Sequence, residues 1–323
     1  NYKTNGILGS KKKPIMIISN ESHYSYKKAA LVSGIGTDSI RYVKTLDNGS
    51  MDPRSLIDTI DSIGDNEILF FIGLTAGTTV KGAYDPIHTI LDIVDGKCWI
   101  HIDGSWGGGV IFTDKYRSLV DGLERTDSFS IDAHKMIGAP LICSALLFNN
   151  KRALLNLNSD NDAEYLFHDN KNFEFNLGNY SLQCGRRVDA LKLWLIWTMI
   201  GTKGIEQHIT YLYDTAIEAD RYINESIYLD SACELSSVNL CFRFYDPSLD
   251  NKSLNQLNID IRNNLKDNGL FFTNYSIIND TIYFRLIVVN KRITIDTLKE
   301  YIDLIIDTGK KLVVQRQKKQ TIS

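Results

Sequence analysis

The residues with the clearest chemical potential stand in the segment Ile131–Met136, which reads Ile-Asp-Ala-His-Lys-Met. Lys135 follows a predicted strand and a histidine, and apolar residues come directly after it. A desolvated lysine amine loses its proton more readily and can then form an imine with an aldehyde cofactor. A surface lysine in a loop between strands would give the same pattern, so this segment alone leaves both interpretations open.

A second segment, Trp99–Gly109, places Asp103 at the end of a predicted buried strand and carries three consecutive glycines at 107–109. Glycines let the backbone pass close to a ligand. A buried acid without a partner is unfavourable, so Asp103 should face a cation or hydrogen-bond donors. An aspartate that caps a helix is the alternative interpretation.

Two weaker segments also follow predicted strands. Residues 74–79 form a small polar turn after the strand Ile68–Gly73, and Glu21–Ser25 carries His23 after the first strand. Such turns are common, and a lone histidine is more often a core or cap residue. All four segments lie at the C-terminal ends of predicted strands, where open α/β sheets bind ligands, and this coincidence favours a shared site.

The elements that must position these segments alternate along the first two-thirds of the chain. Strands that are apolar throughout and separated by amphipathic helices indicate a mainly parallel sheet covered on both faces. The predicted strands are Ile15–Ser19, Ile40–Lys44, Ile68–Gly73, Cys98–Ile102, Phe129–Ile131 and Ile142–Phe148, and the predicted helices are Tyr24–Ser33, Pro53–Ile63, Pro86–Val94 and Lys115–Val120.

The C-terminal third predicts a smaller α+β domain. A helix from Arg186 to Gly201, expected to be buried on most sides, is followed by a second helix over Gly204–Asn224. We therefore predict domains at 1–193 and 194–323. The remaining strands are expected near Val238–Tyr245 and Thr281–Val288, and the remaining helices near Leu254–Asn268 and Ile295–Gly309.

Two stretches depart from this rhythm. Asn149–Glu174 is polar and rich in Asn and Asp around Tyr165, and so long a loop is usually either functional or disordered. Asn1–Ser10 runs without a cap or strand signal straight into a core strand. Because a domain rarely begins so abruptly, the chain is expected to lack an N-terminal part.

Composition argues against several classes of protein. The net charge of −3 over 323 residues disfavours a nucleic-acid binder that relies on a basic field. No apolar run reaches the length of a membrane span. The five cysteines are widely spaced without a CxxC pair, so neither a zinc or other metal site nor a disulfide framework is predicted. We expect a soluble, cytoplasmic protein with no nucleic-acid or membrane partner.

The four segments, in this order, resemble those of the group II pyridoxal-phosphate (PLP) dependent amino-acid decarboxylases, most closely the glutamate and cysteine-sulfinate decarboxylase branch. The resemblance runs from end to end of the chain. It implies the α/β fold of PLP-dependent transferases (fold type I) and a homodimer with the active site at its interface. The matching phrases are Ser22–Ala30, Thr75–Thr79, Gly82–Pro86, His101–Asp103, Trp106–Gly109, Asp132–Met136, Gln183–Asp189 and Tyr283–Leu286.

The resemblance also implies cofactor-binding roles by position. Lys135 matches the lysine that holds PLP, and Asp103 matches the partner of its pyridine nitrogen. His23 matches an imidazole stacked on the ring, Thr75 a hydroxyl near Asp103, and His134 a contact to the phosphate.

Two further residues match groups that handle the substrate. Tyr165 matches a loop tyrosine that returns a proton to the substrate carbon after CO₂ leaves, and Arg285 matches the arginine that binds the substrate carboxylate. A structural ion pair is the alternative for Arg285. The implied reaction is α-decarboxylation of an acidic L-amino acid, with glutamate favoured over cysteine sulfinate and aspartate. A non-catalytic, truncated paralogue is the rival hypothesis.

Three departures from the family pattern bear on these roles. Asp132-Ala133 stands where the branch usually has Asn-Pro, and an acid near a phosphate is unfavourable unless it points away or accepts a hydrogen bond. Gly104 stands where alanine is usual and should loosen the backbone. The family's Ser/Gly-rich phosphate loop and N-terminal dimerisation segment, which also contribute to the substrate pocket, would precede Asn1.

Overall fold

The computed structural model describes residues 2–158, 177–183 and 185–322. Its first part is built on a six-stranded sheet with the order β2-β1-β3-β4-β5-β6. Neighbouring strands are parallel except β5 and β6, which are antiparallel. The strands are β1 (Lys13–Ser19), β2 (Ile40–Val43), β3 (Glu67–Thr75), β4 (Trp99–Asp103), β5 (Ser128–Asp132) and β6 (Ser144–Phe148).

Helices precede or follow most of these strands. Two residues explain why α3 begins at Pro53. The Asp52 carboxylate caps the helix by accepting a hydrogen bond from Arg54 N at 2.9 Å, and Pro53 occupies the first turn. The α-helices are α1 (Tyr2–Asn5), α2 (Ser25–Val32), α3 (Pro53–Asp61), α4 (Ile87–Val94) and α5 (Ala153–Asn158), with 3₁₀ turns at Ile7–Gly9, Thr37–Ser39, Gly107–Phe112, Arg117–Val120, Leu123–Arg125 and Leu177–Tyr180.

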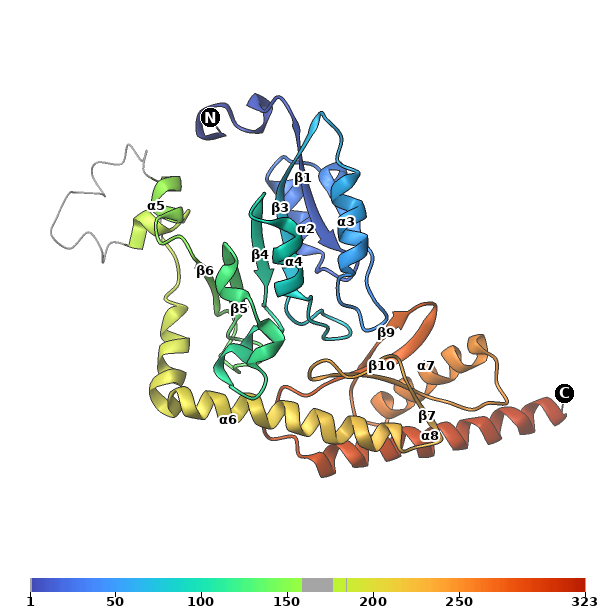
Figure 1. Cartoon of the computed structure of the whole chain (residues 1–323). Helices are drawn as coiled ribbons and strands as arrows, with labels where there is room; N and C mark the ends of the chain where they lie inside the picture. The colour runs from blue at the N-terminus through green and yellow to red at the C-terminus, as the bar shows by residue number, and fades with distance from the viewer. Residues whose placement is uncertain (1, 159–176, 184, 323) are drawn as a thin grey trace.

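A second, smaller sheet follows in the C-terminal part of the chain. It is antiparallel with the order β7-β8-β10-β9. The long helix α6 leads into it from the large sheet and runs beside α8 (Figure 1). The elements are α6 (Ala190–Asn224), β7 (Leu229–Ser231), β8 (Asn239–Phe244), α7 (Asn251–Asp267), β9 (Asn274–Ile278), β10 (Thr281–Ile287) and α8 (Ile295–Ile322).

The large sheet has two chemically different faces, because successive side chains of a strand point to opposite sides. The apolar face packs against α3, α4 and the second half of α6. Its buried strand residues include Ile15, Ile17, Ile72, Leu74, Ile100, Ile102, Phe129 and Ile131. The opposite face meets α2 through Tyr26, and there β4 and β5 carry His101, Asp103, Ser128 and Ser130.

The predicted α/β architecture is confirmed, with differences in detail. The helices expected on either side of Gly201 form one element, α6, bent where Gly201 takes a φ of 66°. The helix expected at Lys115–Val120 is a 3₁₀ turn, and α8 continues to Ile322 instead of ending near Gly309. The predicted domain boundary at 193/194 falls inside α6 and stays a prediction.

One expectation about α6 is wrong. Its first three turns were predicted to be buried on most sides, but Trp194 is 60% exposed and Met199 is 79% exposed. Leu191 and Leu195 are also exposed in this part of the helix.

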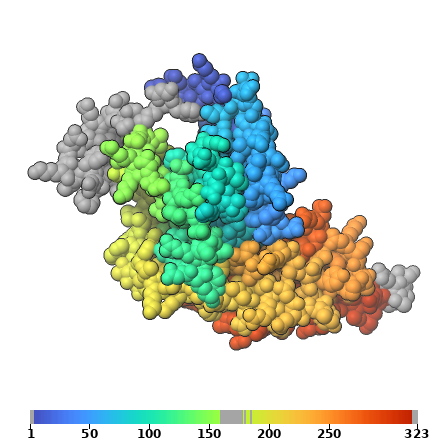
Figure 2. Space-filling view, in the orientation of Figure 1, coloured from blue at the N-terminus to red at the C-terminus, as the bar shows by residue number. Residues whose placement is uncertain are grey.

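The two parts of the chain are in contact. In Figure 2 the residues of the large sheet and its helices, coloured blue to green, lie against the yellow to orange residues of the C-terminal part. In the part of the chain that the structure describes, no helix is long and apolar enough to cross a membrane.

Candidate active site

The C-terminal ends of β1, β3, β4 and β5 are neighbours at one edge of the large sheet. The register pairs Thr75 with Asp103 and Asp103 with Ser130. His23 follows the end of β1, and Lys135 follows the end of β5. The strand order reverses between β1 and β3, which is where open α/β sheets form a ligand-binding crevice. The structure therefore brings the four predicted segments to one edge.

Asp103 has two carboxylate oxygens in different situations. Oδ1 accepts hydrogen bonds from Ser105 N at 3.0 Å and from Ser130 Oγ at 3.4 Å. Within the described residues, Oδ2 has no hydrogen-bond partner. One oxygen thus fixes the side chain, and the other is left for a ligand.

Thr75 presents a buried hydroxyl beside Asp103. Its backbone is fixed, because Thr75 N donates to Asp85 Oδ2 at 2.7 Å and Thr75 O accepts from Asp85 N at 2.9 Å. Burial raises the pKa of Asp85 to about 6, while the hydrogen bonds from Met51 N and Thr75 N lower it. The Thr75 side-chain oxygen is buried without a partner among the described residues. Leaving a buried hydroxyl unpaired costs about 1–3 kcal/mol, so this position suits a polar ligand atom.

Lys135 is held by an acid from the preceding strand. Its ammonium lies 2.9 Å from Asp132 Oδ2, and Asp132 Oδ1 accepts a hydrogen bond from Ser144 Oγ at 2.5 Å. The His134 Nε2 atom lies 3.8 Å from Asp132 Oδ2. Asp132 therefore faces two cationic or polar neighbours, and one of them is His134, the residue that the resemblance matches to a phosphate contact.

The two histidines are positioned mainly by backbone or local contacts. His134 Nδ1 lies 3.0 Å from Cys143 O and 3.2 Å from Cys143 N, which fixes the ring against the approach to β6. His23 Nδ1 contacts Ser25 Oγ at 2.9 Å and Ser25 N at 3.3 Å, and its ring lies against Tyr24 with centroids 4.1 Å apart. Neither contact occupies Nε2 of His23.

Arg285 extends from β10 toward the turn after Thr75. Its guanidinium donates through Nε to Thr79 O at 2.8 Å and also through Nη2 to the same oxygen. The Asn239 side chain donates to the same oxygen at 3.1 Å and to Val80 O at 2.9 Å, so the smaller sheet holds this turn at two carbonyl oxygens. Burial lowers the pKa of Arg285 below its ordinary value. Tyr165 lies outside the described residues.

Gly104, directly after Asp103, is tightly packed and does not loosen the backbone as predicted. A Cβ placed on it would lie 2.2 Å from Phe129 Cε2 and 2.9 Å from Ser130 O. Phe129 is only 4% exposed, so its ring cannot easily move away. Gly104 N also donates to Ser130 O at 2.9 Å. Because Gly104 has no side chain, the Phe129 ring on β5 can occupy this space.

Gly104→Ala is therefore expected to lower the free energy of unfolding by about 1–3 kcal/mol through overpacking. Urea unfolding followed by circular dichroism measures this difference. Adding Phe129→Val should recover part of the loss, because the two side chains compete for one space. An unchanged urea midpoint for Gly104→Ala would show that the sheet accommodates the methyl group without strain.

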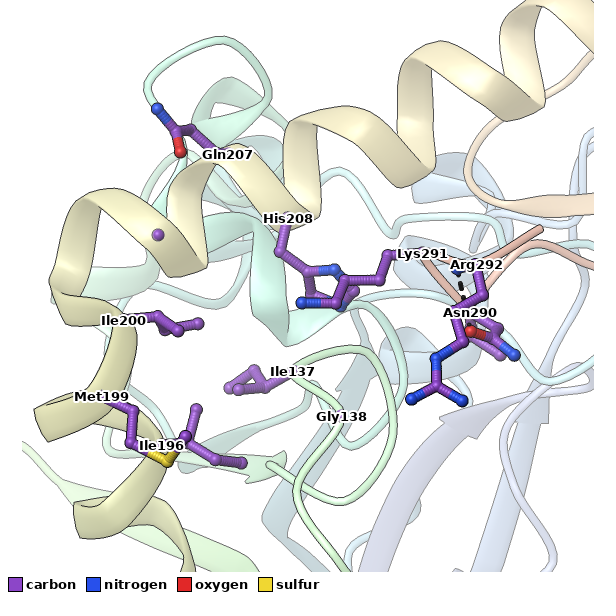
Figure 3. A pocket seen from close by; sticks show the side chains of 12 residues that line it. Ile137, Gly138, Ile196, Met199, Ile200, Gln207, His208, Asn290, Lys291 and Arg292 are labelled. Carbon is purple, nitrogen blue, oxygen red and sulfur yellow. Dashed lines mark hydrogen bonds between the residues drawn. The ribbon is translucent and has the colours of Figure 1, made fainter. Parts of the chain in front are cut away.

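A separate cavity of about 680 Å³ adjoins the residues that follow Lys135 (Figure 3). It is lined by Ile137 and Gly138 from this turn, by α6, and by the loop after β10. His208 Nε2 on α6 lies 3.0 Å from Met136 O and donates to it. Burial lowers the pKa of His208, whereas the hydrogen bond to Met136 raises it. The hydrogen bond from His208 thus attaches the turn that carries Lys135 to α6.

Sequence reasoning missed the polar residues that surround Asp103. Ser128 and Ser130 lie on β5, and His101 lies on β4 two residues before the acid. Their two-residue spacing places them on the same face as Asp103, and this spacing was the available signal. Asp85, which fixes Thr75, was included in a matching phrase but given no role.

Comparison with known proteins agrees with this geometry. The profile of the pyridoxal-dependent decarboxylase conserved domain matches residues 2–245. Over 94% of its own length the chain is 33% identical to the acidic amino acid decarboxylase GADL1 of Xenopus tropicalis. Over 73% of its own length it is 40% identical to the human cysteine sulfinic acid decarboxylase. It is 38% identical to the L-aspartate decarboxylase dtxS4 of Metarhizium robertsii over 76% of its length.

Solved structures share the fold. The crystal structure of mouse CSAD superposes with a TM-score of 0.89 at 30% identity, covering 95% of this chain and 66% of that one. An Oryza sativa TDC structure with PLP and tryptamine gives a TM-score of 0.87 at 20% identity, and this similarity supports the fold alone. The chain spans 61% of the Xenopus relative and 49% of the human one. The chain belongs to the pyridoxal-dependent decarboxylase family, whose cofactor is PLP, and it has the α/β fold of that family.

Proposed function

We propose that this chain carries the PLP site of an enzyme that removes the α-carboxylate of an acidic L-amino acid. The observation that carries this proposal is the edge of the large sheet, where Asp103 Oδ2 and Thr75 Oγ1 both lack partners among the described residues. A carboxylate oxygen and a buried hydroxyl suit the pyridine nitrogen of PLP and a neighbouring polar atom. Lys135 lies beyond the adjacent strand end, so the residues fit this cofactor.

Each remaining residue has a proposed task at this edge. Lys135 holds the cofactor covalently, and Asp103 keeps the pyridine nitrogen protonated. His23, whose ring lies beside the end of β1, covers one face of the cofactor, and His134 contributes to the phosphate site. When bound, PLP supplies a ring that accepts the electrons left behind as CO₂ departs.

Two side chains, Arg285 and Tyr165, would act on the substrate itself. Arg285 uses Nε and Nη2 on Thr79 O, and no described residue bonds to its Nη1, which could therefore bind a carboxylate. Tyr165 would return a proton to the substrate carbon. Names of the relatives support an acidic side chain: acidic amino acid, cysteine sulfinic acid and L-aspartate decarboxylases. Glutamate, cysteine sulfinate and aspartate are therefore the substrates to compare, with glutamate our first choice.

We also propose a homodimer in the cytoplasm. The first half of α6 exposes Leu191, Trp194, Leu195 and Met199, and large exposed apolar patches usually mark protein interfaces. The described cysteines 98, 143, 233 and 241 are all free thiols, which suits a reducing compartment.

A non-catalytic role is favoured by one observation, the ion pair between Lys135 and Asp132. An amine that is bound to a carboxylate as an ammonium ion must first give up its proton before it can bond to an aldehyde. A chain in which this pair persists would bind PLP weakly or not at all.

The deciding experiment is to load the protein with PLP, reduce it with borohydride and map the modified peptide. We expect the adduct on Lys135, and Lys135→Arg should abolish it. Lys192 forms a similar ion pair with an acid three residues before it, since its Nζ lies 2.8 Å from Asp189 Oδ1. Lys192→Arg is therefore the matched control and should leave labelling unchanged. An adduct elsewhere, or none in a protein that binds PLP, would contradict the assignment; no decarboxylation of the three acids would favour the non-catalytic role.

A further inference from the structure

A row of polar side chains leads from the far end of β4 to Asp103. Trp99 Nε1 lies 2.9 Å from Ser128 Oγ, and Ser128 Oγ lies 2.9 Å from His101 Nδ1. On the other side of the ring, His101 Nε2 lies 3.4 Å from Ser130 Oγ, which in turn lies 3.4 Å from Asp103 Oδ1. Side chains of two adjacent strands alternate along this row.

The carboxylate at one end fixes the direction of each proton in this row when His101 is neutral. An indole N–H can only donate and an ionised carboxylate can only accept. Ser130 donates its only proton to Asp103, so a neutral His101 must carry its proton on Nε2 and donate it to Ser130. The unprotonated Nδ1 then accepts from Ser128, whose oxygen accepts from Trp99. All four hydrogen bonds point toward the carboxylate.

We propose that Ser128, His101 and Ser130 are positioning residues that hold Asp103 Oδ1 through this directed chain and so aim Oδ2 at the bound cofactor. The proposal rests on the proposed function for the role of Oδ2, whereas the chain itself involves only residues of this protein. Because His101 Nδ1 must accept from Ser128, the chain is complete only while His101 is neutral. Neighbouring hydrogen bonds of one direction also strengthen each other.

The surroundings of His101 favour its neutral form. Burial lowers its pKa, whereas Asp103 and a hydrogen bond with the Ser128 backbone raise it. The other groups facing the ring are Tyr26 from α2, with centroids 6.4 Å apart, and Phe71 from β3, with centroids 6.2 Å apart. Burial raises the pKa of Tyr26 well above its ordinary value, so this neighbour is uncharged near neutral pH. Asp103 is thus the one charged group at the ring among the described contacts.

The chain is tested first on the PLP-free protein, by ¹⁵N NMR of its six histidines. His101→Gln identifies the His101 signals. We expect a neutral ring near pH 7 with the proton on Nε2, and a mixture of both neutral forms in Ser128→Ala, which loses the donor at Nδ1. Asp103→Asn should lower the pKa of His101 further, since Asp103 raises it. A proton on Nδ1, or a charged ring at pH 7, would overturn the proposal.

The positioning role is tested on the PLP-loaded protein. Ser130→Ala is expected to weaken PLP binding about tenfold, because a hydrogen bond to a charged group is lost. The visible absorption of the cofactor should also change its pH dependence. Ser130→Thr keeps the hydroxyl and should restore both properties. Equal loss in Ser130→Ala and Ser130→Thr, or no effect of Ser130→Ala, would contradict a role for the hydroxyl. If the parent protein fails to bind PLP, the proposed function fails, while the NMR result still decides the chain.

Discussion

Asp103→Asn is expected to reduce decarboxylation by the PLP-loaded protein by a factor of roughly 10² to 10³, the equivalent of about 3–4 kcal/mol for removing one partner of a desolvated charge pair. The amide can still accept from Ser105 N and Ser130 Oγ, which lie 3.0 Å and 3.4 Å from Oδ1. It cannot supply the negative charge that Oδ2 offers to a protonated pyridine nitrogen. The fold should therefore survive while cofactor chemistry is lost.

Asp127→Asn is the matched control for this substitution. Asp127 stands at the opposite edge of the same sheet, directly before β5, and its Oδ2 accepts from Ile100 N at 2.7 Å. An amide oxygen can make the same contact, so PLP affinity and rate should stay near those of the parent. Steady-state assays and PLP titrations of both variants make the comparison. A rate for Asp103→Asn within about threefold of the parent would rule out its proposed role in the electron sink.

The large sheet could be predicted because each of the strands β1 to β5 carries buried apolar residues. Each predicted strand overlaps an observed one, and Ile15, Ile72 and Ile100 are buried in the core. The smaller sheet was only half predicted. β7 is three residues long, Leu-Asp-Ser, and β9 begins Asn-Tyr-Ser, so neither carries a hydrophobic run. Both strands exist because β8 and β10 pair with them.

The candidate site could be predicted in outline but not in its contacts. Strand ends gave the positions of Asp103 and Lys135, because parallel strands end at the same edge. The sequence could not show that Phe129 fills the space beside Gly104, since this depends on the spacing between β4 and β5. Nor could it show that the first half of α6 is exposed, because an apolar helix looks the same whether its own chain or a partner covers it.

Asp132 is the residue whose replacement should improve the site. Its Oδ2 lies 2.9 Å from Lys135 Nζ, and Oδ1 accepts from Ser144 Oγ at 2.5 Å. If Lys135 holds PLP as proposed, the carboxylate would compete with the cofactor for this lysine and would also repel the cofactor phosphate. Two like charges about 4 Å apart near a protein surface repel by roughly 1–4 kcal/mol, depending on how far water screens them.

Asp132→Asn is therefore expected to tighten PLP binding by about tenfold or more, because it removes the repulsion and the competing ion pair while an amide oxygen still accepts from Ser144. PLP titration followed by cofactor absorption measures the change, and borohydride labelling of Lys135 should become faster. Asp132→Glu keeps the charge and is the control that should show no gain. Weaker binding in Asp132→Asn than in the parent would mean that the acid supports the site, for example by orienting Lys135, and that the repulsion is outweighed.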